Sequence, residues 1–305
     1  PQLIILSILV FILAKLMPWD PFTGQINPNT DPKQIEALRQ KFGFYDPWYK
    51  QYARWVTNML KGDFGISYGF KVPVSDLLGQ RVGNTFWLSL LCVTFLYIIA
   101  LPLGVLSGRY SGSKFDKAVT LYNFVTYAIP AFIFYLLMIL LFSYTLHIFP
   151  SSGSVDAGVK GFAYAISRLR HMLLPAICYA LIATTGTVQY LRNEVIDAKG
   201  SDYVRTARSK GVPIDKVYSH HIFRNSILPI AAFFGFTLTG LISGSVFMET
   251  IFGYPGMGKL FMEAIQSRDY SVLTILIMIF GFLTLLGSLL SDIIMSIVDP
   301  RIRIE

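Results

Sequence analysis

Long apolar runs, separated by short polar connections, constrain this chain more than any other feature. Five of them span residues 84–108, 118–146, 172–191, 226–248 and 272–298. Each reaches the ~20 residues that an α-helix needs to cross the hydrocarbon core of a bilayer. A sixth run, residues 1–17, is apolar except for Lys15. We favour a first membrane helix over a signal peptide there, because no small-residue cleavage site follows. The sequence therefore predicts an all-α membrane protein with six transmembrane helices. Because it does not begin with Met, we expect the first helix to be incomplete.

The composition agrees with this class. Apolar residues make up 53% of the chain and charged residues only 14%, against about 25% charged in soluble domains. A net charge of +8 can indicate nucleic-acid binding. Here the cations lie in connections between apolar runs, which is typical of membrane orientation, so we expect no nucleic-acid partner. Both cysteines, Cys92 and Cys178, fall in apolar runs, which argues against a disulfide framework and against a metal site.

The distribution of Lys and Arg predicts the orientation. One set of connections holds twelve Lys or Arg in fifty residues: 109–117, 192–225 and 299–305. The alternate set holds thirteen in 114 residues: 18–83, 147–171 and 249–271. Since connections rich in Lys and Arg face the cytoplasm, we expect both termini to be cytoplasmic.

Residues 18–83 form the longest polar segment, which we expect to be an extracytoplasmic loop or subdomain after the first helix. Pro47 to Leu60 is a helix candidate, and its aromatic stripe suits a membrane interface or packing on the membrane domain: Trp48, Tyr52 and Trp55. Gly62 to Ser67 reads as a turn. Residues 84–305 then form a core of five helices with a cytoplasmic loop at 192–225.

That loop, residues 192–225, is called the basic segment below, and it contains helix signals. Ser201 is a candidate N-cap, and Asp202 suits the first helical turn. Arg208 and Lys210 suit the last turn, Gly211 is a candidate C′ residue, and Pro213 can open a second helix as its N1 residue. The pattern predicts a capped helix that can grip another protein. An ordinary solvated loop is the alternative.

The apolar runs lack the groups that energise transport. The four runs between residues 84 and 248 contain no Asp, Glu, Lys or Arg, and the last run contains only Asp292. Proton-coupled carriers need ionisable groups in the membrane. A phosphate-binding loop of the type G-x-x-x-x-G-K-[ST] does not occur in the chain either. We therefore expect no catalytic residues and no cofactor in this chain, and a transporter of this kind must obtain energy from a partner.

Several motifs resemble one family. Tyr203 to Gly211, with Leu228-Pro229, resembles the "EAA" coupling loop of bacterial ATP-binding-cassette importer permeases. Gly62-Asp-Phe-Gly65 with Ser67, Glu249 to Leu260 followed by Arg268-Asp-Tyr270, and Asp299-Pro-Arg301 resemble signatures of the peptide/nickel subfamily, and within it the first oligopeptide or dipeptide permease subunit. The resemblance covers essentially the whole chain. The Glu that begins the general pattern is replaced here by Arg205, which places any contact assigned to that Glu in question.

The resemblance implies a type I importer in the bacterial cytoplasmic membrane. Its partners would be a second homologous permease, two cytoplasmic ATPases that bind ATP and Mg²⁺, an extracytoplasmic peptide-binding protein, membrane lipid and a peptide substrate. The helices would enclose a path with alternating access, a two-state bundle biased by ligand and nucleotide. A nickel importer permease has the same architecture and remains an alternative. An ATPase-independent carrier or channel is the second alternative, although it gives the basic segment no role.

Three groups of residues are candidate functional sites. The ATPase-coupling group comprises Tyr203, Val204, Arg205, Ala207, Arg208, Lys210 and Gly211. Tyr203, Val204 and Ala207 share one side of the helix and either fill a groove on the ATPase or pack on their own membrane domain. The substrate-path group comprises Asn123, Tyr127, Thr184, Thr185 and Gln189, for which hydrogen bonding between helices is the alternative. The external-gate group comprises Glu249, Phe252, Pro255, Gly256 and Gly258, where the glycines near Met257 shape a turn.

Overall fold

The structure is a computed structural model, and it describes residues 1–16, 36, 40, 45–242 and 245–298. The Asp299-Pro-Arg301 motif and the cytoplasmic connection 299–305 lie outside these residues. Within the described part, the chain is mostly helical, and its one isolated β-bridge joins Ile66 to Pro73.

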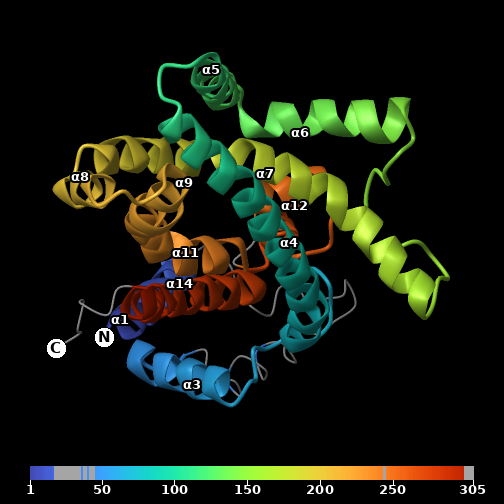
Figure 1. Cartoon of the computed structure of the whole chain (residues 1–305). Helices are drawn as coiled ribbons and strands as arrows, with labels where there is room; N and C mark the ends of the chain where they lie inside the picture. Colours follow the sequence, from blue (N-terminus) through green and yellow to red (C-terminus); the bar gives the residue numbers. More distant parts are fainter. Residues whose placement is uncertain (17–35, 37–39, 41–44, 243–244, 299–305) are drawn as a thin grey trace.

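Four helical stretches have the length and apolar composition to cross a membrane. They are α4 (Val74–Arg109), α7 (Phe162–Lys199), α14 (Tyr270–Val298) and the stretch Leu228–Ile251, which comprises α11 (Leu228–Ile242) and α12 (Val246–Ile251). Figure 1 shows α11 and α14 side by side and α4 crossing α7. Helix α1 (Gln2–Leu16) is apolar but has only 15 residues, fewer than the ~20 of a full span. The predicted count of six spans therefore stays a prediction.

The run 118–146 is not one continuous helix, so the single span predicted for it stays a prediction. It divides into α5 (Lys114–Ala128), α6 (Ala131–Ile139) and the π-helix η2 (Leu140–Thr145), with a bend of 96°. The break lies at Ile129-Pro130, where Ile129 is extended with φ −88° and ψ 121°. Proline disfavours the helical conformation of the residue before it and lacks an N–H of its own. Figure 1 shows the resulting corner between α5 and α6. If the bent pair is one span, the described residues contain five.

Two glycines bring α4 and α7 into close contact. A Cβ on Gly104 would lie 2.8 Å from the Leu191 Cβ, and a Cβ on Gly108 would lie 2.7 Å from the Val195 Cβ. Gly104 and Gly108 form a G-x-x-x-G pair, which lets the backbones of membrane helices approach closely. The pair fixes α7, and the basic segment at its end, against α4.

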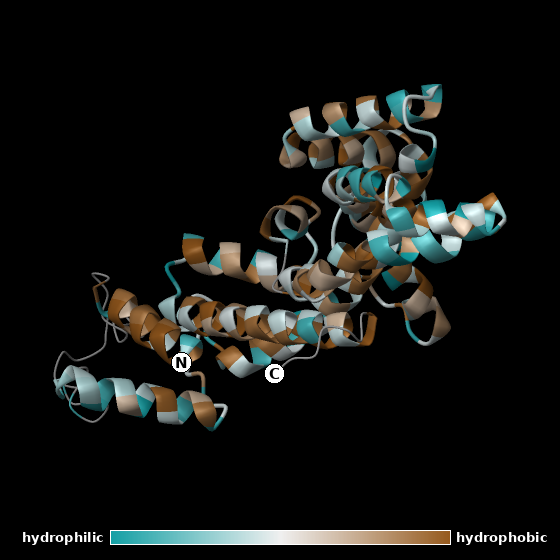
Figure 2. Cartoon of the chain, turned by 60° about the vertical axis from the view of Figure 1, so that its left-hand side comes forward, coloured by the Kyte–Doolittle hydropathy of each residue, from teal (hydrophilic) through white to brown (hydrophobic). Residues whose placement is uncertain are grey.

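The polar segment before α4 is partly helical, as expected. Helix α3 (Trp48–Leu60) follows Pro47 and lies beside α1. The Tyr52 and Ser7 hydroxyls form a hydrogen bond at 2.7 Å. The ring centres of Tyr52 and Trp55 lie 5.4 and 5.9 Å, respectively, from that of Phe11. Trp48 remains exposed, so only part of the predicted aromatic stripe packs. Figure 2 shows that α3 is more hydrophilic than its neighbour α1, which matches an interfacial helix. Helix α4 begins at Val74, earlier than the apolar run that starts at residue 84.

Candidate functional site

The basic segment contains the predicted capped helix, α8 (Asp202–Ser209). Its C-terminal end is a Schellman motif: the N–H of Gly211 donates to the Arg208 carbonyl at 2.9 Å, and that of Val212 to the Ala207 carbonyl at 3.2 Å. Gly211 has a φ of 74°, the left-handed conformation that glycine adopts without a steric penalty. The prediction of a C′ glycine at this position is therefore confirmed.

Two residues that flank α8, Ser201 and Pro213, differ from the predictions. Ser201 occupies the N-cap position of α8, but its hydroxyl donates to the Ala198 carbonyl at 2.5 Å instead of capping α8. The last carbonyls of α7 have no helical partner, and Ser201 satisfies one of them. Pro213 is the N-cap residue of α9 (Ile214–Lys216), not its N1 residue, because its ψ of 139° is extended. From α9 the chain continues through the π-helix η3 (Val217–Ile222) and α10 (Phe223–Ser226) to α11.

One face of α8 is buried against its own chain. Val204 is 0% and Ala207 6% exposed, and both belong to an apolar cluster with Leu191, Val195, Val217 and Ile222. Of the two alternatives for these side chains, the geometry favours packing on their own membrane domain. Val204 and Ala207 are therefore not available to fill a partner's groove. The other predicted coupling residues of the helix and its C-terminal turn are exposed, and three of them are basic: Tyr203, Arg205, Arg208 and Lys210. Tyr203 is thus exposed although Val204 and Ala207 beside it are buried, and Arg205 lies 3.6 Å from the exposed Asp202 carboxylate.

The basic segment is also tied to the connection between α4 and α5. The Arg192 guanidinium pairs with the buried Asp116 carboxylate through two bonds, Nε to Oδ1 at 2.5 Å and Nη2 to Oδ2 at 2.8 Å. Lys199 Nζ donates to Ser111 Oγ at 3.1 Å. Arg109 Nη2 donates to Asp215 Oδ1 at 2.7 Å, and its guanidinium lies 4.6 Å from the centre of the Tyr218 ring. Sequence reasoning missed these contacts, because partners more than 70 residues apart leave no local pattern.

The substrate-path candidates lie on facing parts of α5 and α7, and three of the five, Asn123, Thr184 and Gln189, make hydrogen bonds between these helices. The Thr184 hydroxyl is 2.9 Å from that of Tyr122, and Asn123 Nδ2 lies 3.4 Å from Gln189 Oε1. Such contacts match the alternative of hydrogen bonds between helices. The buried oxygens of Asn123 and Thr185, Oδ1 and Oγ1, have no hydrogen-bond partner. Tyr127 is 87% exposed and lies one turn beyond Asn123 on α5.

The external-gate candidates form a buried turn between α12 and α13 (Met257–Gln266). The Glu249 carboxylate is 1% exposed, and it accepts from the Thr85 hydroxyl at 2.8 Å and from the Lys259 N–H at 3.0 Å. A Cβ on Gly256 would collide with this carboxylate, and one on Gly258 would lie 2.9 Å from the Val246 nitrogen. Glycine is therefore required at both positions, because the Glu249 carboxylate and the Val246 backbone leave no room for a Cβ. The predicted turn near Met257 is present.

The same turn is fastened to α4. The Asn84 side chain donates to the Pro255 carbonyl at 3.0 Å, and the Met257 N–H donates to the Thr85 hydroxyl at 2.8 Å. Phe252 is buried, with its ring 5.8 Å from that of Tyr135 on α6. Tyr254 is fully buried, and burial raises the pKa of its hydroxyl to about 12, so this side chain stays neutral. The gate motif thus connects α4, α6 and α12.

Two of the other motifs meet directly. The buried Asp269 carboxylate accepts from the Ser67 hydroxyl, from the Gly69 N–H at 3.0 Å, and from the Val272 N–H at 3.3 Å. The last of these bonds caps the N-terminus of α14. Asp269 therefore anchors the turn that follows α3, whose glycines Gly62 and Gly65 both have a φ near 80°.

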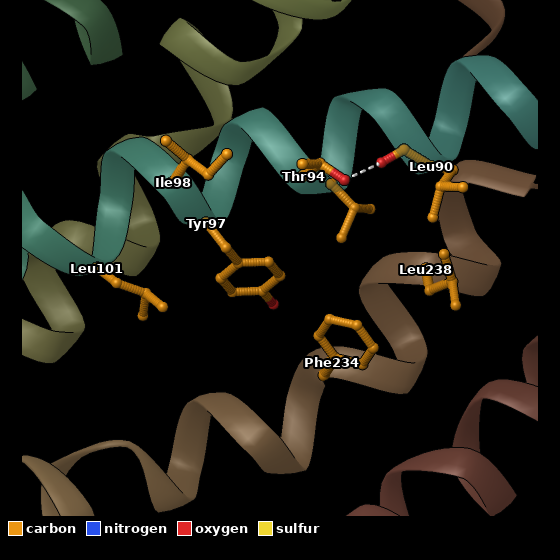
Figure 3. A pocket seen from close by; sticks show the side chains of 8 residues that line it. Leu90, Thr94, Tyr97, Ile98, Leu101, Phe234 and Leu238 are labelled. Carbon is orange, nitrogen blue, oxygen red and sulfur yellow. Dashed lines mark hydrogen bonds between the residues drawn. The ribbon is translucent and has the colours of Figure 1, made fainter.

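A shallow apolar groove lies between α4 and α11 (Figure 3). Its volume is about 380 Å³, and it is lined by Leu90, Val93, Thr94, Tyr97, Ile98, Leu101, Phe234 and Leu238. The Thr94 hydroxyl donates to the Leu90 carbonyl of its own helix at 2.7 Å, so little polarity faces the groove. Its chemistry suits a hydrocarbon chain or an apolar helix face. Among the described residues, no group of three or more His, Cys, Asp or Glu side chains can hold a metal ion.

Comparison with known proteins gives a consistent result. Residues 100–304 match the family described as binding-protein-dependent transport system inner membrane component, and residues 2–89 match the corresponding N-terminal family. The oligopeptide transport system permease protein AppB of Bacillus subtilis is 38% identical over 99% of this chain and 96% of its own. A putative peptide transport system permease of Brucella abortus is 34% identical over 100% and 96%, respectively.

A solved structure has the same fold. A chain of the MetNI methionine ABC transporter, in an inward-facing conformation, superposes with a TM-score of 0.57 at 18% identity and covers 73% of this chain and 96% of its own. At this identity the likeness concerns the fold alone. The matched families span almost the whole sequence, and the relatives match it nearly end to end. The chain therefore belongs to the binding-protein-dependent transport system inner membrane components, the permeases of ATP-binding-cassette importers.

Proposed function

We propose that this chain is a permease subunit of an ATP-driven importer of oligopeptides or dipeptides, and that α8 is its ATPase-docking helix. The observation that carries the proposal is the way in which α8 is packed and held by its own chain. Its Val204–Ala207 face is buried in the chain, its end is fixed by Gly211, and Arg205, Arg208 and Lys210 are presented outward. A rigidly mounted helix with an exposed basic face suits a cytoplasmic partner with an acidic groove. The names of the relatives support the peptide substrate.

The rest of the assembly follows as part of the proposal. Two permeases with six helices each would enclose the path, both termini would face the cytoplasm, and an external peptide-binding protein would deliver the substrate. Two partner ATPases would supply ATP and Mg²⁺ chemistry. The turn at residues 62–67 and the buried 249–260 motif would form the external side. Their shared attachment to α4 and α14 supports a common movement of these parts.

The polar face of α5 and α7 is proposed to border the path. Tyr127 and Gln189 are exposed, and each lies within one of the long runs that contain no charged residue. Exposed polar side chains in the membrane normally face protein or water-filled cavities. The unpartnered Asn123 and Thr185 oxygens lie beside them. Donors from a peptide backbone or from water would satisfy such acceptors once the helices separate.

The test is transport by the complex purified from its native membranes and reconstituted in liposomes. ATP-dependent uptake is measured for radiolabelled alanine peptides of two to five residues and for Ni²⁺. We expect peptide uptake that needs ATP and the binding protein. Uptake of Ni²⁺ alone would favour the nickel importer, and uptake of either solute without any ATPase in the complex would favour the carrier or channel.

A further inference from the structure

The strongest connection within the proposed cytoplasmic face joins the basic segment to the start of α5. The Asp116 side chain is only 4% exposed, and both of its carboxylate oxygens accept from Arg192. Its Oδ2 also accepts from the Gly112 N–H at 2.8 Å. A bidentate guanidinium–carboxylate pair fixes orientation as well as distance. Removing one member of a buried pair leaves an uncompensated charge, so its loss costs far more than that of an exposed pair.

The neighbouring ion pair provides a natural contrast. Arg109, the last residue of α4, and Asp215 of α9 join the basic segment to the end of α4 at 2.7 Å, but the Asp215 side chain is 80% exposed. Exposed pairs contribute little because water and salt screen them. Of the two ion pairs, Asp116–Arg192 is therefore the stronger link, and it joins the first turn of α5 to α7, which also meet through the Tyr122–Thr184 and Asn123–Gln189 bonds.

These contacts form a continuous connection. Helix α8 packs through Val204 on the part of α7 that contains Leu191 and Val195. Arg192 lies between those two residues on α7 and binds Asp116 in the first turn of α5. Helix α5 ends at the bend before Pro130, and it bears Asn123 and Tyr127. Helix α8 is thus connected, through Arg192 and Asp116, to the helix that carries the substrate-path candidates.

We propose that Asp116 and Arg192 are positioning residues that make α5 move as one body with α7 and the docking helix, so that ATP hydrolysis is converted into movement of the path. This inference rests on the proposed function and deepens it. It assigns no contact with substrate or nucleotide to either residue. Breaking the pair should leave the docking face intact and uncouple hydrolysis from transport.

The experiment measures peptide molecules transported per ATP hydrolysed, with the reconstituted complex and the alanine peptides described above. Asp116→Asn keeps the shape of the side chain and its bond from Gly112 but removes the charge. We expect assembly with the ATPases and ATP hydrolysis to persist while the transport ratio falls by about fivefold or more, the usual range of a coupling between sites. Asp215→Asn is the matched control and should keep the wild-type ratio.

A second arm separates positioning from general stability. In a Cys92→Ser, Cys178→Ser background, the pair Asp116→Cys and Arg192→Cys is joined by a short thiol-reactive linker. Restoration of the transport ratio by the linker supports the proposal, because the link replaces the ion pair. An unchanged ratio in Asp116→Asn, or a linked protein that stays uncoupled, overturns it. Failure of the wild-type complex to contain an ATPase would instead refute the proposed function.

Discussion

Replacing Val204 with Ala tests whether α8 is held by its own chain. Val204 is fully buried among Leu191, Val195 and Val217. The change removes two methyl groups, each worth roughly 0.8 kcal/mol when buried, and the remaining cavity adds a further cost. The free energy of local unfolding of α8 should therefore fall by about 2 kcal/mol. Because 1.4 kcal/mol is a factor of ten, exchange of the α8 amides should accelerate by roughly 30-fold.

The assay is amide hydrogen exchange of residues 202–209 in purified permease in lipid nanodiscs, without any ATPase. Thr206→Ala is the matched control, since Thr206 lies on the exposed face of the same helix and Ala has a higher helix propensity. We expect unchanged or slower exchange in that variant. Equal exchange in Val204→Ala and Thr206→Ala would refute the burial of this face, and α8 would then depend on a partner for its order.

Three further predictions concern other parts of the fold. Gly211→Val places a β-branched residue at a φ of 74°, which costs roughly 1–2 kcal/mol. We expect α8 to fray, which circular dichroism and faster trypsin cleavage at Arg208 would report. An unchanged cleavage rate would contradict the Schellman turn. Gly108→Leu forces a side chain into Val195 and should lower the free energy of unfolding by about 1–3 kcal/mol or more, which is measured as a lower Tm in detergent. Gly186→Ala is the control, because the space around Gly186 is open, and it should leave the Tm unchanged. Ser67→Ala removes a donor to the buried Asp269 carboxylate and should lower the free energy of unfolding by about 1.5–3 kcal/mol. We expect faster proteolysis at Lys71 in this variant. An equal rate in Ser67→Ala and wild type would contradict the role of Asp269 as the anchor of this turn.

The sequence predicted the elements whose causes are local. Apolar length predicted the long helices, and Pro47 with the aromatic stripe predicted α3. Gly211 predicted the end of α8, because only a few residue types adopt its conformation without strain. The bend at Pro130 is also a local effect, because proline disfavours the helical conformation of the residue before it, and Ile129 is extended.

The remainder depends on pairings between distant residues. The amphipathic pattern of α8 shows that Val204 and Ala207 share a face, but it does not show whether this chain or a partner protein covers that face. The cluster with Val195 and Val217 answers this question for the described residues. The Asp116–Arg192 pair, the Ser67–Asp269 anchor and the enclosure of Glu249 likewise arise from tertiary contacts. The polar residues of α5 and α7 can be identified in the sequence, but the hydrogen bonds between the two helices depend on how the helices pack.

The most direct test of the central claim is site-specific photo-crosslinking on α8 in the intact complex. A photoreactive amino acid replaces Arg205 on the exposed face, Val204 on the buried face, or Trp48 on α3 as an outer control. We predict that the probe at Arg205 crosslinks to an ATP-binding subunit, that the probe at Val204 forms only crosslinks within the permease, and that the probe at Trp48 does not reach the ATPase. An ATPase crosslink from Trp48 but none from Arg205 would contradict the assignment of α8 as the docking helix.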